Sequence, residues 1–154
     1  MSTRIWSFLP LDMRFVPTQD RIENAIAWLR LAMPAYKVEA IDHGKIAFFD
    51  SGGNMGATYC PQCHTEQSAG DWSEWMTEDY DDEAGFEFSP RVMPCCGQLA
   101  TLDRIIFENS CFFGRFGIAV TDTMQTYPES EIEAFATQLG THLGCAIRFL
   151  ESHY

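Results

Sequence analysis

Two cysteine clusters constrain this chain more than any other feature. Cys60 and Cys63 are separated by two residues, and the adjacent pair Cys95 and Cys96 follows about thirty residues later. A two-residue spacer lets both thiolates of one turn face a single metal ion, and zinc prefers four such ligands arranged as a tetrahedron. The spacing therefore predicts a structural zinc site with the ligands Cys60, Cys63, Cys95 and Cys96.

The two cysteine turns resemble the knuckles of a zinc ribbon. In the run from Tyr59 to Cys63 a proline shapes the turn, and Gly97 tolerates the backbone conformation that follows the ligand Cys96. A regular second knuckle would have its other cysteine at Met93, so Cys95 has to substitute for it. Four protein ligands leave no open coordination position, so we expect the metal to stabilise the fold rather than to activate water.

Three alternatives to this ligand set remain open. His64 could replace Cys95 as the fourth ligand, or the cysteines could be reduced thiols without a metal. A redox role for the Cys60–Cys63 pair is disfavoured, because no strand–helix–strand pattern places it at the start of a helix. The two remaining cysteines, Cys111 and Cys145, stand alone near apolar segments and are predicted to be core thiols.

The negative charge of the chain is concentrated in its middle. The formal net charge is −12 over 154 residues, and the segment between Lys45 and Arg91 carries ten acidic residues and no Lys or Arg. Such a segment repels phosphate backbones and attracts basic surfaces. The charge therefore indicates a basic protein partner and argues against nucleic acid.

Aromatic residues adjoin the densest part of this acidic segment. Trp72 and Trp75 lie at helical spacing, and exposed tryptophans ringed by acids would make good interface anchors. The alternatives are that the tryptophans pack inside the lobe and that the acids form a solvated surface. The partner-binding residues predicted on this basis are Trp72, Trp75, Asp79, Asp81, Asp82 and Glu83.

The segments on either side of the cysteine turns show regular periodicity. Before them we expect a strand at 5–9, a helix at 22–33, and strands at 38–41 and 46–49 joined by a hairpin turn at 42–44. In the middle we expect a short helix around 72–76, a solvated loop at 81–85 and a helical turn at 101–105. After them we expect a strand at 116–120, a helix from Pro128 to Gly144 and a strand at 145–150. The pattern predicts an α+β fold with ferredoxin-like βαβ halves, one domain over 1–154, with a zinc-ribbon-like acidic lobe inserted at 55–100.

The chain also resembles a group of small bacterial zinc-ribbon-containing proteins of unassigned function. The shared elements are a Cys-Pro-x-Cys turn, an Asp-Trp pair, a Pro-Cys-Cys-Gly turn and a C-terminal βαβ unit; here they are Cys60 to Cys63, Asp71-Trp72, Pro94 to Gly97 and Arg115 to Leu150. The resemblance implies a zinc-ribbon insertion and no catalytic residue. A weaker likeness links acidic proteins of this size to immunity proteins that neutralise bacterial toxins.

These observations favour a non-catalytic zinc-binding protein that engages a basic partner, for which a toxin immunity protein is the concrete form. The alternatives are a nucleic-acid-associated zinc-ribbon module and an enzyme whose site is not recognisable. The chain contains no nucleophile elbow, phosphate loop or His-Glu-x-x-His motif. No apolar run approaches the roughly 20 residues of a membrane span, and the N-terminal segment is unlike a secretory signal, so a cytoplasmic protein is expected. The oligomeric state is left open.

Overall fold

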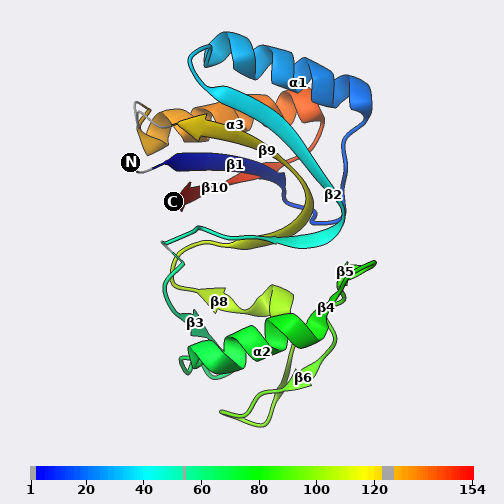
Figure 1. Ribbon diagram of the computed structural model, residues 1–154, viewed down its shortest axis with the longest axis vertical. Helices are drawn as coiled ribbons and strands as arrows, with labels where there is room; N and C mark the ends of the chain where they lie inside the picture. The colour runs from blue at the N-terminus through cyan, green and yellow to red at the C-terminus, as the bar shows by residue number, and fades with distance from the viewer. Residues whose placement is uncertain (1–2, 54, 123–126) are drawn as a thin grey trace.

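The protein is a mixed α+β structure in which a sheet carries helices on one face and a lobe of short elements at its far end (Figure 1). The computed structural model describes residues 3–53, 55–122 and 127–154. In these residues no helix is both long enough and apolar enough to cross a membrane.

The N-terminal part of the sheet region is a strand–helix–strand unit. It consists of β1 (Arg4–Pro10), α1 (Gln19–Ala32) and β2 (Lys37–Phe49). The helix buries Ala25 and Leu29, which share one face because residues four apart lie on the same side of a helix. It ends before Pro34, as expected, since the residue before a proline avoids the helical conformation.

The C-terminal part repeats this pattern with β9 (Phe112–Asp122), α3 (Glu129–Leu143) and β10 (Ile147–His153). Helix α3 buries Ile132, Leu139 and Leu143 as its apolar spacing predicts. Gly144 then adopts a left-handed conformation with φ 76°, and its amide donates to the carbonyl of Gly140. This is the usual way for a glycine to end a helix.

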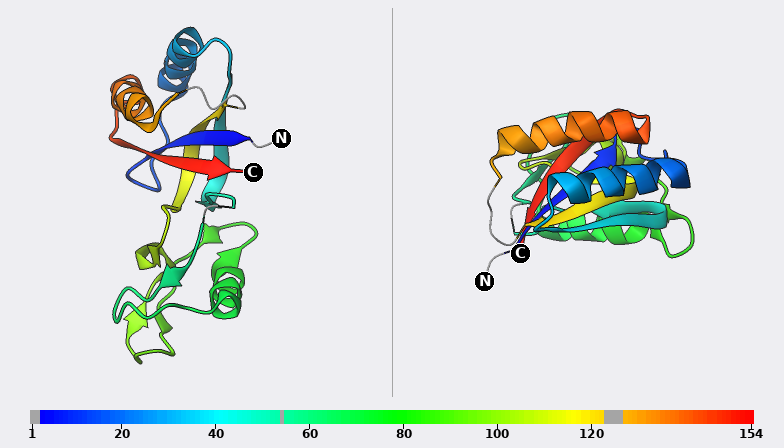
Figure 2. Two further views of the ribbon diagram at one scale, coloured as in Figure 1. Left: turned by 90° about the vertical axis from the view of Figure 1, so that its left-hand side faces the viewer. Right: turned by 90° about the horizontal axis from the view of Figure 1, so that it is seen from above.

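The strands of the two parts interleave in one sheet. The order is β10-β1-β9-β2, and each of these neighbouring pairs is antiparallel. Helices α1 and α3 lie side by side over the same face (Figure 2). Trp6, Phe8 and Ile118 of the sheet pack there against Leu29 and Leu139 of the helices.

The hairpin predicted at 42–44 is wrong. β2 runs without interruption from Lys37 to Phe49, and both of its ends pair with β9. The pairing register shifts between Asp42 and Ala47, and Asp42 accepts a hydrogen bond from the Gly44 amide. The Asp-x-Gly sequence therefore forms a bulge within one long strand, because β9 continues past it and supplies a partner on both sides.

The segment 50–111, between β2 and β9, is named the cysteine lobe here. Its elements are β3 (Thr58–Tyr59), α2 (Ala69–Asp79), β4 (Tyr80–Asp81), β5 (Gly85–Phe86), β6 (Arg91–Val92), β7 (Leu99–Ala100), η1 (Leu102–Arg104) and β8 (Ile106–Phe107). The predicted helix around 72–76 and the helical turn at 101–105 are confirmed by α2 and η1. The solvated loop expected at 81–85 is confirmed at 82–84, which form the exposed turn of the β4–β5 hairpin, while Asp81 and Gly85 pair with each other.

The cysteine lobe is attached to the sheet along one strand edge. β5 lies parallel to β2, with Gly85 opposite Ile46. Gly85 has φ 77°, and a Cβ atom there would come within 2.3 Å of the Ile46 carbonyl oxygen. Only glycine fits this close approach, so the attachment depends on that residue.

Candidate metal centre

The first cysteine turn follows β3 directly. The Cys60 amide donates to the Thr65 carbonyl and the His64 amide donates to the Cys60 carbonyl, both at 2.9 Å. An isolated bridge between Tyr59 and Glu66 closes the turn. These bonds hold Cys60 and Cys63 on the same tight loop.

The second cysteine turn connects β6 and β7, which form an antiparallel pair. The Met93 amide donates to the Gln98 carbonyl and the Gly97 amide donates to the Met93 carbonyl, both at 2.8 Å. Gly97 has φ 74°, so the conformation expected after the ligand Cys96 is present. Gln62 of the first turn donates through its side-chain amide to the Leu99 carbonyl at 3.0 Å and so ties the two turns together.

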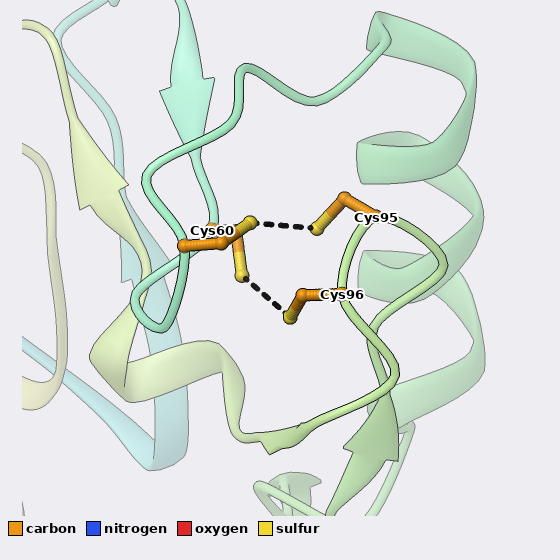
Figure 3. Close-up of side chains that lie close together, drawn as sticks. Cys60, Cys95 and Cys96 are labelled. Carbon is orange, nitrogen blue, oxygen red and sulfur yellow. Dashed lines mark hydrogen bonds between the residues drawn. The ribbon is translucent and has the colours of Figure 1, made fainter.

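The four cysteine sulfurs converge between the two turns. All four Sγ atoms lie within 4.8 Å of one another. The Cys60–Cys96 and Cys63–Cys95 sulfur pairs are separated by 3.9 Å and 3.3 Å. Figure 3 shows Cys60 facing Cys95 and Cys96 across the gap. A tetrahedral zinc–thiolate centre with Zn–S bonds of about 2.3 Å has sulfurs about 3.8 Å apart, so this cluster has the dimensions to hold a metal ion.

The surroundings of the cluster are asymmetric. Cys60 is fully buried, whereas Cys63 and Cys95 are exposed. Hydrogen bonding to the side chain and backbone of Thr65 lowers the pKa of Cys63 to about 6. The hydrogen bond with Cys63, followed by desolvation, raises the pKa of Cys95 to about 12. A negative charge on the Cys63 sulfur thus opposes ionisation of Cys95, and a bound cation would stabilise both thiolates.

His64 is not part of the cluster. Among the described residues, the group that could hold a metal ion consists of the four cysteines, and His64 is exposed with φ 63°. The sequence interpretation did not single out Thr65, whose hydroxyl lies 3.1 Å from the Cys63 sulfur. Its position two residues after Cys63 was the only signal for it.

The two predicted anchor residues Trp72 and Trp75 are buried, so the expectation that they form a surface anchor is corrected. Trp72 is 8% exposed and packs edge-on against Phe107, and Trp75 is 3% exposed. The guanidinium of Arg91 covers the Trp75 ring at 5.4 Å. A buried indole stabilises the core of the lobe more than an exposed one would. Both residues therefore fit the alternative in which the tryptophans pack inside the lobe.

Asp79 is also buried, and its carboxylate stabilises the backbone of the lobe. Its two oxygens accept hydrogen bonds from the amides of Glu87, Phe88 and Ser89 at 3.1, 2.8 and 2.9 Å. Phe88 has φ 57°, a conformation that a bulky residue adopts only when neighbouring contacts hold it. Asp79 therefore maintains a strained turn and is not available to a partner.

The remaining predicted acids, Asp81, Asp82 and Glu83, are exposed on the β4–β5 turn. Asp81 accepts hydrogen bonds from the Ala84 and Glu83 amides, which lower the pKa of its carboxyl group. Lys45 of β2 lies over the Tyr80 ring at 5.3 Å and donates to the Asp82 carbonyl. The turn therefore presents the carboxylates of Asp81, Asp82 and Glu83 to solvent, next to Tyr80, whose ring contacts the ammonium group of Lys45.

No family model matches this chain, and no curated protein or solved structure is detectably similar to it.

Proposed function

We propose that the protein is a non-catalytic zinc protein whose cysteine lobe engages a basic protein partner. The observation that carries the proposal is the convergence of four cysteine sulfurs within 4.8 Å of one another. Thiolate-only sites favour zinc among the common divalent ions of proteins, and a site with four protein ligands is closed to substrate. The proposal also implies a reducing compartment such as the cytoplasm, because only reduced cysteines bind the metal.

The finer description of the fold belongs to the same proposal. The sheet order β10-β1-β9-β2 with two strand–helix–strand units supports a ferredoxin-like frame. Two cysteine turns, one closed by a bridge and one by a hairpin, support a zinc-ribbon variant in the lobe.

The metal part of the proposal is tested by measuring zinc in the purified protein. We expect one zinc per chain, with Cys60→Ser abolishing binding and His64→Ala leaving it unchanged. A chain that folds fully with no metal, or that loses zinc on substitution of His64, would contradict the assigned ligands.

The partner part is supported by the charge of the lobe surface. Acidic side chains are exposed along α2 and around the β4–β5 turn: Asp71, Glu74, Glu78, Asp81, Asp82, Glu83 and Glu87. On the same stretch Arg91 is half-buried against Trp75, with its Nη1 3.9 Å from a Glu78 carboxylate oxygen. A surface of one sign accelerates association with an oppositely charged partner. A toxin immunity protein, which must capture a cationic effector quickly, is the concrete form of this proposal.

A matched pair of variants tests this surface. Asp82→Asn, Glu83→Gln and Glu87→Gln together remove three exposed charges from the lobe, and Glu23→Gln, Glu39→Gln and Glu133→Gln remove three exposed charges from the sheet region. Both proteins serve as bait for a lysate of the source organism at low and high salt. We expect a basic protein that is retained at low salt, released at high salt and weakened by the lobe variant only. Equal retention by the two variants would refute a role for the acidic turn.

A further inference from the structure

The junction between the sheet and the cysteine lobe contains a second candidate site, separate from the metal centre. A cavity of about 280 Å³ lies between the segment after β1, the start of β10 and the region of η1 and β8. Leu11, Met13, Ile105 and Phe107 supply apolar walls, and Arg148 supplies a positive charge. Asp103 and Ser110 add polar groups to the lining, and the cavity is open to solvent on one side. Its volume is near the lower limit of about 300 Å³ for small-molecule sites, which combine apolar walls with a few placed polar groups.

Arg148 is partly buried and has no carboxylate partner among the described residues. Its guanidinium lies 4.0 Å from the centre of the Phe112 ring, and Nη2 donates to the Phe113 carbonyl at 3.3 Å. Its Nε is buried and makes no hydrogen bond. Burial lowers the pKa of Arg148, but an arginine remains charged throughout the physiological range. The cavity therefore contains a permanent positive charge, and the Asp103 carboxylate that also lines it forms no ion pair with Arg148.

Arg4 of the same sheet is more deeply buried than Arg148, and its Nε likewise makes no hydrogen bond, but its other guanidinium nitrogens have partners. It pairs with Asp122, lies 3.8 Å from a Glu151 oxygen and donates to the Tyr127 carbonyl at 2.8 Å. Buried charges are normally matched in this way, because an unmatched one is costly. In the described residues no carboxylate oxygen lies within 4.0 Å of the Arg148 guanidinium. The missing partner points to an anion supplied from outside the chain.

We propose that this cavity binds a small organic monoanion with an apolar body, such as a medium-chain carboxylate. The carboxylate pairs with Arg148, and the apolar chain lies against Leu11, Met13 and Phe107. Asp103 also lines the cavity, and its negative charge disfavours multiply charged anions such as phosphate. The ligand class follows from three features of the cavity: the positive charge of Arg148, the negative charge of Asp103 and the apolar side chains beside them.

Calorimetric titration of the metal-loaded protein with octanoate tests this site. Octanol and octylammonium carry the same chain with a neutral or positive head group, and inorganic phosphate has no apolar body. We expect octanoate to bind more tightly than the other three. Arg148→Met, which keeps an unbranched apolar side chain without the guanidinium, should weaken octanoate about tenfold or more, since a charge-assisted hydrogen bond is lost.

Two further variants keep the result interpretable. Arg104→Met removes an exposed charge from η1 and should leave octanoate affinity unchanged. Ser110→Trp adds a large side chain at an exposed residue that lines the cavity and should abolish binding without unfolding the protein, as circular dichroism would verify. The proposal is overturned if octanoate does not bind, if octanol binds equally well, or if Ser110→Trp binds octanoate like the unaltered chain.

Discussion

The sheet region and the cysteine lobe reach their folds by different means. The sheet region uses long elements: α1 and α3 have 14 and 15 residues, and β2 and β9 have 13 and 11. Strands of the lobe such as β3, β6 and β7 have two residues each. Long elements bury a continuous apolar face, whereas short ones leave most of the backbone in turns. The sheet region can therefore rely on its long elements, whereas a metal cross-link would add stability to the short elements of the lobe.

The sheet region and the cysteine lobe also differ in charge. The segment between Lys45 and Arg91 contributes −10 of the net charge of −12, and the rest of the chain is close to neutral. Concentrated like charge repels itself and opposes compaction. A metal bound by the four sulfurs would oppose this repulsion as well, because it would restrain both cysteine turns at once.

The largest effect is expected from Cys60→Ser. Structural zinc contributes an apparent free energy of folding of about 10–16 kcal/mol in small metal-dependent units. Removal of Cys60, the buried ligand, is expected to eliminate much of this stabilisation. We expect the NMR amide signals of the lobe to lose dispersion while those of α1 and α3 persist. Cys145→Ser, the same change in the sheet region, is the control and should leave both sets of signals in place. Loss of the sheet signals together with those of the lobe would break the comparison, because it would make the two regions one cooperative unit.

Leu139→Ala tests the opposite region. Leu139 is fully buried beneath α3, so its truncation should lower the free energy of unfolding by about 2–5 kcal/mol. The metal stoichiometry should not change, because the residue lies outside the lobe. Chemical denaturation and metal analysis measure the two quantities. Leu31→Ala on α1 is the matched control: Leu31 is 84% exposed, and its truncation should change stability by less than about 0.5 kcal/mol.

The most local of the three effects is expected from Asp79→Ala, which sharpens the comparison inside the lobe. It removes the acceptor of three backbone hydrogen bonds, and bonds to a charged group contribute about 1.5–3 kcal/mol. We expect faster amide hydrogen exchange at Glu87, Phe88 and Ser89 with zinc still bound. Asp82→Ala, an exposed acid on the adjacent turn, is the control. If both variants exchange alike, Asp79 does not brace this turn.

Periodic segments were predictable because their signal is local. The apolar spacing in α3, the proline before it and Gly144 after it are all contained in adjacent turns, and the helix bounds follow from them. The β2 strand was divided in two because Asp42-His43-Gly44 is a good local turn, and only its pairing with β9, some seventy residues away, makes it a bulge. Tertiary pairing thus overrode a correct local preference.

The residue roles within the lobe divide along the same line. The spacing of Cys60, Cys63, Cys95 and Cys96 was sufficient to predict their convergence, because a metal site of this kind is defined by short turns. The spacing of Trp72 and Trp75 placed them on a helix but did not show which side of that helix was covered. Asp79 looked identical to its acidic neighbours, since nothing local marks a carboxylate that will meet the amides of residues 87–89.

The sequence by itself determined the helices, the two cysteine turns and the location of the charge, since each depends on residues close together in the chain. The tertiary structure alone decided which tryptophans and carboxylates are buried, how β2 pairs and where Arg148 lies without a carboxylate partner. These features depend on contacts between segments far apart in sequence, and such contacts form only when the apolar surfaces of both segments are buried together.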